Sequence, residues 1–178
     1  MNNDNLTPEK IELVEKFRRW MVQRRYAENT IRTYSGMLEV FFGYYPDKKA
    51  SEIGLKDVNR FNYYYIIQKG LSASYQNQMI NAIKKFYLTM LGTNLELTHL
   101  ERPRKASPLP KVIPLDIVKE MLQRTGNLKH RTALTMVYSL GLRRGEILNI
   151  KLTDLSSRDR TLVVRKGKGG KDRLLPIP

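Results

Sequence analysis

The sequence predicts a mainly α-helical protein in which a four-helix bundle is followed by a mixed α+β part that ends in a β-hairpin. Apolar residues recur every three or four positions through the first hundred residues, which is the period of an amphipathic helix. A basic, proline-rich stretch interrupts this pattern at residues 102–111, and the apolar period becomes strand-like beyond residue 160. We therefore expect a helical domain at 1–100, a linker at 101–113 and a second domain at 114–178.

Four amphipathic helices account for the first domain. Thr7-Pro8-Glu9 opens the first helix, because a hydroxyl cap, a proline at the first helical position and an acid near the positive end of the helix dipole all favour a helix start. Ser72 caps the fourth helix in the same way. In the third, at residues 55–68, Tyr63, Tyr64 and Tyr65 are interpreted as packing residues. The predicted buried faces comprise Ile11, Val14, Phe17 and Met21 in the first helix, Ile31, Tyr34, Leu38, Phe41 and Tyr45 in the second, and Met79, Ile83, Phe86 and Met90 in the fourth.

The chain changes character at the linker. Residues 102–111 hold three prolines and four basic side chains, and proline cannot donate the backbone hydrogen bond that a helix requires. Beyond the linker, helices are expected at 115–124 and 130–140, and another begins near Arg143. Strands at 161–164 and 174–177 flank a glycine-rich loop and form the predicted hairpin. On the 130–140 helix, Ala133, Val137 and Leu140 are expected to face inward, and Tyr138 lies on a helix interpreted as buried.

The formal net charge of +15 indicates a polyanionic partner. The first hundred residues carry 14 basic and 10 acidic side chains, whereas the remaining 78 carry 18 and 7, so most of the excess lies in the second half. Nucleic acid is the expected partner, ahead of a surface that is charged only for solubility, and an anionic membrane surface comes after both.

Composition excludes several other classes of protein. The chain has no cysteine, and its two histidines, His99 and His130, lie far apart, so no disulfide, metal site or cofactor is expected. No apolar run reaches the length of about 18 residues that a membrane-spanning helix requires, and residues 1–5 lack the pattern of a secretion signal. A cytoplasmic, nucleoid-associated protein is the resulting expectation.

One candidate for chemistry is the stretch Gly141-Leu142-Arg143-Arg144-Gly145-Glu146. The glycine break aims the start of a helix, where exposed amides and the helix dipole favour an anion. Arg143 could present its planar guanidinium to two phosphate oxygens, and Glu146 lies one helical turn further on, in position to hold that guanidinium. A surface arginine paired with a glutamate would leave the same pattern.

A second candidate is the basic, glycine-rich stretch at residues 165–173. Its glycines let the backbone approach a ligand closely, and its five basic side chains could grip a phosphate backbone, although the solvated tip of a hairpin would look alike. The glycine and lysine spacing does not match that of a nucleotide-binding loop, and the stretch leads into a strand instead of a helix. ATP binding is therefore excluded.

Three pieces of the second half, in this order and at this spacing, resemble the tyrosine recombinase family, which includes phage integrases and the Xer-type resolvases. They are Gly141-Leu142-Arg143 with Glu146, Leu152-Thr153-Asp154-Leu155, and Gly167-Lys168-Gly169 with Lys171 and Arg173. The first half is similar to the SAM-like core-binding domain of the family. This similarity rests on Asn29-Thr30, Tyr34, Phe41 and Phe86-Tyr87, and Leu109-Pro110-Lys111-Val112 resembles the start of the family's catalytic domain.

The resemblance implies a role for each matching residue. Arg143 corresponds to the first catalytic arginine, which stabilises the pentavalent phosphorane during strand cleavage, and Glu146 corresponds to a supporting acid. Lys168 corresponds to the hairpin lysine that protonates the departing 5′ oxygen, with Lys171 as a second candidate because a glycine-rich tip does not fix the register. In the family a tyrosine attacks DNA and forms a 3′-phosphotyrosyl link without metal or ATP.

None of the ten tyrosines corresponds to the family's nucleophile. In the family that tyrosine follows a histidine-x-x-arginine motif, and both would come later than Pro178. We therefore expect this chain to bind DNA as a monomer without cleaving it, and the longer protein to act as a homotetramer on paired DNA sites. A natural short protein that regulates recombination sites without catalysis is the alternative. An RNA-binding helical protein is disfavoured, because no aromatic and basic sheet motif is present.

Candidate DNA contacts are polar or basic positions on the second and fourth helices, in the linker and near the catalytic motifs. Most should touch phosphate, and only a few should touch base edges. They are Thr30, Arg32, Ser74, Asn77, Gln78, Asn81, Lys84, Lys85, Arg104, Lys105, Arg144, Lys166 and Arg173.

Overall fold

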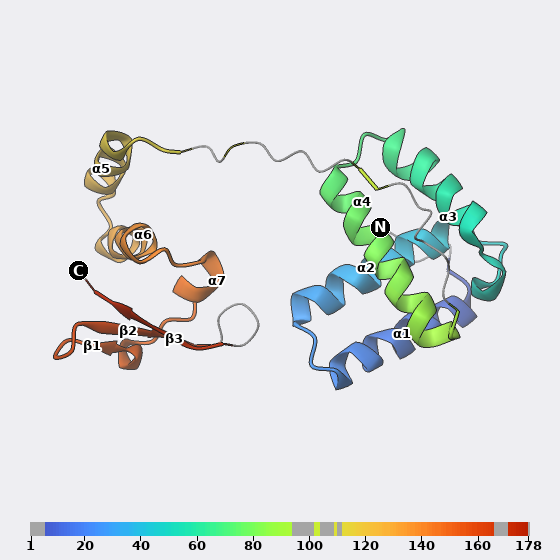
Figure 1. Ribbon diagram of the computed structural model, residues 1–178, viewed down its shortest axis with the longest axis horizontal. Coiled ribbons are helices and arrows are strands. Elements are labelled where there is room, and N and C mark those ends of the chain that lie inside the picture. The colour runs from blue at the N-terminus through green and yellow to red at the C-terminus, as the bar shows by residue number, and fades with distance from the viewer. Residues whose placement is uncertain (1–5, 94–101, 104–108, 110–111, 166–170, 178) are drawn as a thin grey trace. The chain divides into compact units, whose positions relative to one another are not determined.

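The computed structural model describes residues 6–93, 102–103, 109, 112–165 and 171–177 (Figure 1). The chain divides into two compact units, Met1–Ser107 and Pro108–Pro178, and each has a hydrophobic core of its own. The division falls inside the proline-rich stretch at residues 102–111. The individual limits expected from the sequence, at residues 100, 101, 113 and 114, remain predictions.

The first unit is a bundle of four helices, which confirms the predicted fold class. α3 continues into a π-helical segment, Asn62–Ile67, and α4 continues into another, Tyr87–Leu91. Ser72 caps α4, where its hydroxyl accepts a hydrogen bond from the backbone N–H of Tyr75 at 3.1 Å, as the sequence predicts. The helices are α1 (Pro8–Gln23), α2 (Glu28–Tyr44), α3 (Leu55–Phe61) and α4 (Ala73–Phe86), with a 3-10 turn at Ala50–Glu52 between α2 and α3.

Aromatic rings fill the centre of this bundle. Phe86 of α4 meets Phe17 of α1 and Phe42 of α2 edge to face, at centroid distances of 5.6 and 5.2 Å. Phe41 of α2 meets Phe61 of α3 in the same geometry at 5.1 Å. Such pairs are worth about 0.5–1.5 kcal/mol each beyond the area they bury, and these three join all four helices.

The buried face of α1 differs from the predicted one at a single position. Ile11 is 42% exposed, whereas Lys10 is buried and its ammonium donates hydrogen bonds to the backbone carbonyls of Tyr45 and Pro46. Lys10 and Ile11 precede Val14 by four and three residues, so both fit the helical period. Burial lowers the pKa of Lys10, and the two carbonyl oxygens compensate for the lost hydration. The chain turn after α2 therefore selects the residue that faces inward.

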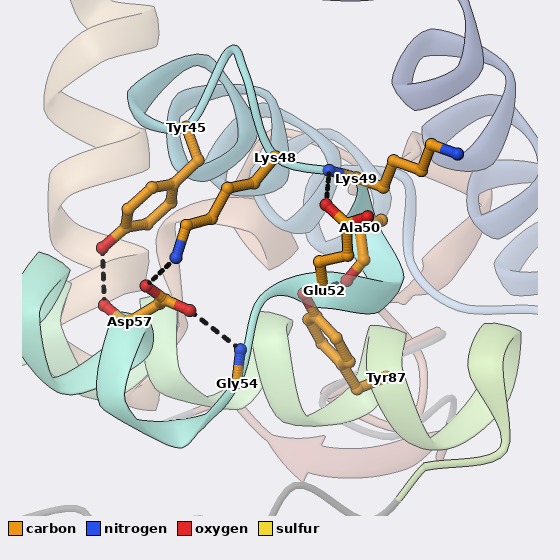
Figure 2. Close-up of polar contacts among 8 residues, drawn as sticks. All are labelled: Tyr45, Lys48, Lys49, Ala50, Glu52, Gly54, Asp57 and Tyr87. Atoms are coloured by element: carbon orange, nitrogen blue, oxygen red, sulfur yellow. Dashed lines mark hydrogen bonds and ion pairs between the residues drawn. The ribbon is translucent and has the colours of Figure 1, made fainter.

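Polar contacts fix the connection between α2 and α3 (Figure 2). The Asp57 carboxylate accepts hydrogen bonds from the Lys48 ammonium at 2.5 Å and from the Gly54 amide at 3.1 Å. The Tyr45 hydroxyl donates to the Asp57 carbonyl at 2.7 Å. On the neighbouring 3-10 turn, the buried Tyr87 hydroxyl donates to the Ala50 carbonyl at 2.8 Å, so the helical segment that continues α4 also holds this connection.

The second unit combines three helices with a small antiparallel sheet. Its strands run in the order β1-β2-β3, and the last rung of the hairpin pairs Val164 with Arg173. The predicted first strand matches β2, and β3 begins one residue earlier than predicted. The two-residue β1 was not foreseen. The elements are α5 (Leu115–Arg124), α6 (Leu128–Leu140), α7 (Arg144–Ile147), a 3-10 turn at Leu152–Asp154, β1 (Leu155–Ser156), β2 (Thr161–Val164) and β3 (Arg173–Pro176).

The core of this second unit is small. Leu142, Leu162 and Val164 are buried together, and partly buried side chains of α6 and α7 pack against them. Val137 and Leu140 face this cluster as predicted. Tyr138 does not, because it is 55% exposed, and no residue of α6 is fully buried, so the interpretation of this helix as buried was wrong. Two tyrosines of the first unit, Tyr63 and Tyr64, are likewise about half exposed, and of the three neighbours only Tyr65 packs on the core.

Replacing Tyr87 by phenylalanine should destabilise the helical unit by about 1–3 kcal/mol, because the buried carbonyl of Ala50 then loses the hydroxyl donor of Tyr87. Urea unfolding followed through the fluorescence of Trp20 measures this free energy. Tyr63→Phe is the matched control, since it removes a hydroxyl from a half-exposed ring and should leave the unfolding midpoint unchanged. Equal midpoints for both variants would contradict the role of the buried hydroxyl.

Candidate functional site

Arg143 occupies the junction between α6 and α7. α6 ends at Gly141 in a left-handed conformation, with φ at +60°, which glycine adopts without steric cost. The next side chain, Leu142, enters the small core, and Arg143 follows as the extended N-cap residue of α7, with its side chain 58% exposed. α7 is a single turn of four residues and aligns few peptide dipoles, so the helix start adds little to anion binding here.

The carboxylate of Glu146 is the centre of this site. It accepts a hydrogen bond from the Arg143 guanidinium at 2.9 Å and another from the Arg143 backbone N–H at 2.8 Å. Both terminal nitrogens of Arg173 also donate to it, at 2.7 and 2.8 Å. The sequence predicted the pairing of Glu146 with Arg143. It did not predict Arg173, which lies 27 residues further along the chain.

Glu146 remains ionised in this environment. Its side chain is only 6% exposed, and four hydrogen bonds use the acceptor sites that two carboxylate oxygens offer. The bonds from Arg173 and from the Arg143 amide, together with that from the Arg143 side chain, lower the pKa of Glu146 from 4.5 to about 2. Two guanidinium groups share one carboxylate, so the cluster keeps a net positive charge beside the exposed Arg143.

A second ion pair lies at the other end of the hairpin loop. Arg165 follows β2, and its Nε donates to the buried carboxylate of Asp154 at 2.6 Å. Asp154 also accepts from the Lys151 amide at 3.0 Å, and these contacts lower its pKa. The residues on either side of the loop, Arg165 and Arg173, are thus each paired with a buried acid. Lys171 is exposed within the loop, whereas Lys166 and Lys168 lie outside the described residues.

The candidate DNA contacts of the helical unit lie on α2 and α4. Thr30 is partly buried, Arg32 is exposed and donates to Asn29 at 3.0 Å, and Lys85 lies near the rings of Trp20 and Tyr26. The exposed candidates on α4 are Ser74, Gln78, Asn81 and Lys84.

Arg102 contacts two of these candidates and was not singled out from the sequence. Its guanidinium donates to the side-chain oxygens of Asn77 at 3.3 Å and Asn81 at 3.1 Å. Asparagines at i and i+4 share one helix face, but no local signal shows that an arginine 21 residues beyond Asn81 returns to them. Arg104 and Lys105, also in the linker, lie outside the described residues, and Arg144 of α7 is exposed.

The described residues hold neither a metal-ligand cluster nor a membrane-spanning helix. Among them, no group of three or more acidic, histidine or cysteine side chains could hold a metal ion. Within the same part of the chain, no helix combines the length and apolar character needed to cross a membrane.

Both units match models of one protein family. Residues 13–97 match the model described as "Phage integrase, N-terminal SAM-like domain", and residues 111–178 match the one described as "Phage integrase family". The helical bundle and the α+β unit that carries Arg143 and Glu146 therefore define an integrase-type protein. The chain belongs to the phage integrase family of tyrosine recombinases.

Relatives in sequence and in structure agree with this assignment. "Tyrosine recombinase XerA" of Pyrococcus horikoshii is 33% identical to this chain, and the match covers 93% of this chain and 56% of the relative. An "Integrase/recombinase" of Escherichia coli is 29% identical, and that match covers 94% of this chain and 50% of the relative. The chain thus spans about half the length of the curated relatives it matches. This chain also resembles the protein in the structure of a lambda integrase tetramer bound to a Holliday junction, with a TM-score of 0.73 at 17% sequence identity. The match covers 97% of this chain and 52% of the integrase chain, and it shows the same fold.

Acid should weaken the second unit through Glu146. Because the folded pKa of about 2 lies below the ordinary 4.5, the ionised carboxylate stabilises the unit fully above about pH 4.5, and this contribution is lost as the pH falls toward 2. Carboxyl-carbon NMR of Glu146 should give a midpoint near 2, and hydrogen-exchange protection of β2 and β3 should fall over the same interval.

The matched variants are Glu146→Gln and Glu120→Gln. Glu146→Gln should reduce protection at neutral pH and flatten its dependence on acid, because the variant has no carboxylate to protonate. Glu120 forms an exposed ion pair with Arg124, so its replacement should leave the profile unchanged. A Glu146 midpoint near 4.5 would show that the arginines do not hold the carboxylate as described.

Proposed function

We propose that this chain is the DNA-binding portion of a site-specific tyrosine recombinase and carries the first part of its catalytic site. The observation that carries the proposal is the Arg143–Glu146 pair in the unit that matches the integrase family, with Arg143 exposed on one side and held on the other. A guanidinium in this arrangement is preorganised for a phosphate group, because its orientation does not depend on the ligand.

The proposed roles follow the order of strand cleavage. Arg143 stabilises the charge that develops on the phosphorane, and Glu146 orients it. Lys168 is the proposed general acid that protonates the departing 5′ oxygen, and Lys171 is the second candidate. The reaction forms a 3′-phosphotyrosyl link to a tyrosine outside this chain, so this chain binds DNA without cleaving it.

The proposed partner is double-stranded DNA, which both the helical unit and the second unit would contact. The excess positive charge of the second half supports this, as do the candidate contacts on α2 and α4. Proteins of similar fold include a lambda integrase dimer bound to a core site and a lambda integrase tetramer bound to a Holliday junction. By analogy, the longer protein would act as a homotetramer on paired sites, while this chain alone would be a monomer.

Binding to duplex DNA should depend steeply on salt. If about six phosphates are neutralised, the association constant should fall roughly a thousandfold between about 50 and 200 mM salt, because each contact releases condensed counterions. Fluorescence anisotropy with a labelled duplex measures this slope, and a single strand of the same length serves as the comparison. A flat titration would remove the case for a DNA-binding role.

On a nicked suicide duplex, this chain should form no covalent adduct, and a longer protein that includes the nucleophile should form one. In that longer protein, Arg143→Ala should abolish the adduct, since losing a preorganised charge costs about 3–4 kcal/mol or more in the transition state. Its DNA affinity should stay within about tenfold, because a single phosphate contact is worth about 1–2 kcal/mol to binding. Denaturing gels measure the adduct, and Arg144→Ala is the neighbouring control. An adduct on the 178-residue chain itself would overturn the proposal.

The same assay separates the two lysines. In a substrate with a 5′-bridging phosphorothiolate, the 5′ sulfur departs as a thiolate and needs no proton. This substrate should therefore rescue cleavage by Lys168→Ala but not by Arg143→Ala. If this substrate rescued Lys171→Ala and not Lys168→Ala, the general acid would be Lys171 instead of Lys168.

A further inference from the structure

Arg173 connects β3 of the second unit with α7. It is the first residue of β3 and forms the last hairpin rung with Val164, and its guanidinium reaches across to α7. We propose that Arg173 is a positioning residue, which holds the guanidinium of Arg143 in place through the carboxylate of Glu146. This inference rests on the proposed function and adds a residue that acts on Arg143 instead of on DNA.

The contacts of the Glu146 carboxylate differ between Arg173 and Arg143, and the difference supports a positioning role for Arg173. Arg173 directs both terminal nitrogens at Glu146, one to each oxygen, at 2.7 and 2.8 Å. Arg143 directs one terminal nitrogen at it, and its side chain is 58% exposed against 32% for Arg173. Arg173 is therefore engaged with the acid, whereas Arg143 is supported by the acid and still open to solvent. A forked pair fixes the plane of the carboxylate, and that plane sets the direction of Arg143.

Arg173 also limits the position of its near neighbour Lys171. The Arg165–Asp154 pair holds one end of the loop and the Arg173–Glu146 pair holds the other, and both acids are buried. Adjacent residues extend at most about 3.6 Å each, so the backbone of Lys171 stays within about 7 Å of Arg173. One bidentate contact thus ties a candidate general acid and the phosphate-binding arginine to the same carboxylate.

The alternative is that Arg173 contacts DNA directly, as the sequence suggests. A double-mutant cycle in the full 178-residue chain separates the two roles. Arg143→Ala and Arg173→Met should each lower duplex affinity by up to about tenfold and reduce the salt slope by about 0.9, the value for one phosphate contact. Under our proposal the salt slope of the double variant also falls by only about 0.9, because both changes remove the same phosphate contact. If the two arginines contacted separate phosphates, the slope would fall by about 1.8 and the two losses of affinity would multiply.

Two further variants exclude a merely structural effect. Arg173→Lys keeps the charge but cannot form the fork, so it should behave like Arg173→Met, whereas a plain phosphate contact would be retained by lysine. Arg165→Met removes the bond to Asp154 without touching Glu146, and Arg143→Ala should keep its full effect in that background. Hydrogen exchange of β2 and β3 checks that each variant is folded.

Each outcome has a separate meaning. Non-additivity of Arg173 with Arg143, together with failure of Arg173→Lys to restore binding, supports the positioning role. Additive losses, restoration by lysine, or an Arg173→Met variant that binds like the unaltered chain would overturn it. If the unaltered chain does not bind duplex DNA, or Arg143→Ala changes neither affinity nor slope, the proposed function itself fails.

Discussion

The second unit depends on one interaction, the pairing of the buried Glu146 carboxylate with Arg143 and Arg173. An ionised acid removed from water is costly unless partners replace its hydration, and here four hydrogen bonds do so. Removing either arginine would leave the acid short of donors, and removing the acid would leave two cations side by side. The Glu146 carboxylate thereby joins the first residue of β3 to α7 and to the guanidinium of Arg143.

The two units are stabilised in different ways. The helical unit contains a continuous core of aliphatic side chains and interlocking aromatic rings, and its polar contacts fix one connection. In the second unit only three of the described residues form the buried cluster, and buried acids tie the hairpin to the rest. Apolar burial is non-directional and roughly proportional to area, and a close-packed core is stiff, whereas a bidentate pair fixes the direction of particular groups. The first unit is thus suited to act as a rigid surface, and the second to orient particular side chains.

This difference agrees with the distribution of charge. The second half carries most of the excess of basic residues, yet the two arginines on either side of the hairpin loop are paired with buried acids. Formal charge therefore overstates the number of side chains that can meet a polyanion. Arg173 forms both of its terminal bonds to Glu146 and is 32% exposed, so it is less open to such contacts than Arg143, which is 58% exposed, or Arg165, which is 60% exposed, although each is also paired with a buried acid.

The sequence by itself determined the fold class, the four helices, the β2 strand and the pairing of Arg143 with Glu146, because these depend on residues within a few positions of one another. The helical period alone could not choose between Lys10 and Ile11, and the helix that carries Tyr138 was wrongly interpreted as buried, since the elements that pack on a helix decide which of its residues are buried. Likewise, only the tertiary structure brought Arg173 to Glu146 and Arg102 to Asn77. These contacts span 27 and 25 residues, and a long-range pair leaves no period or spacing in a single sequence.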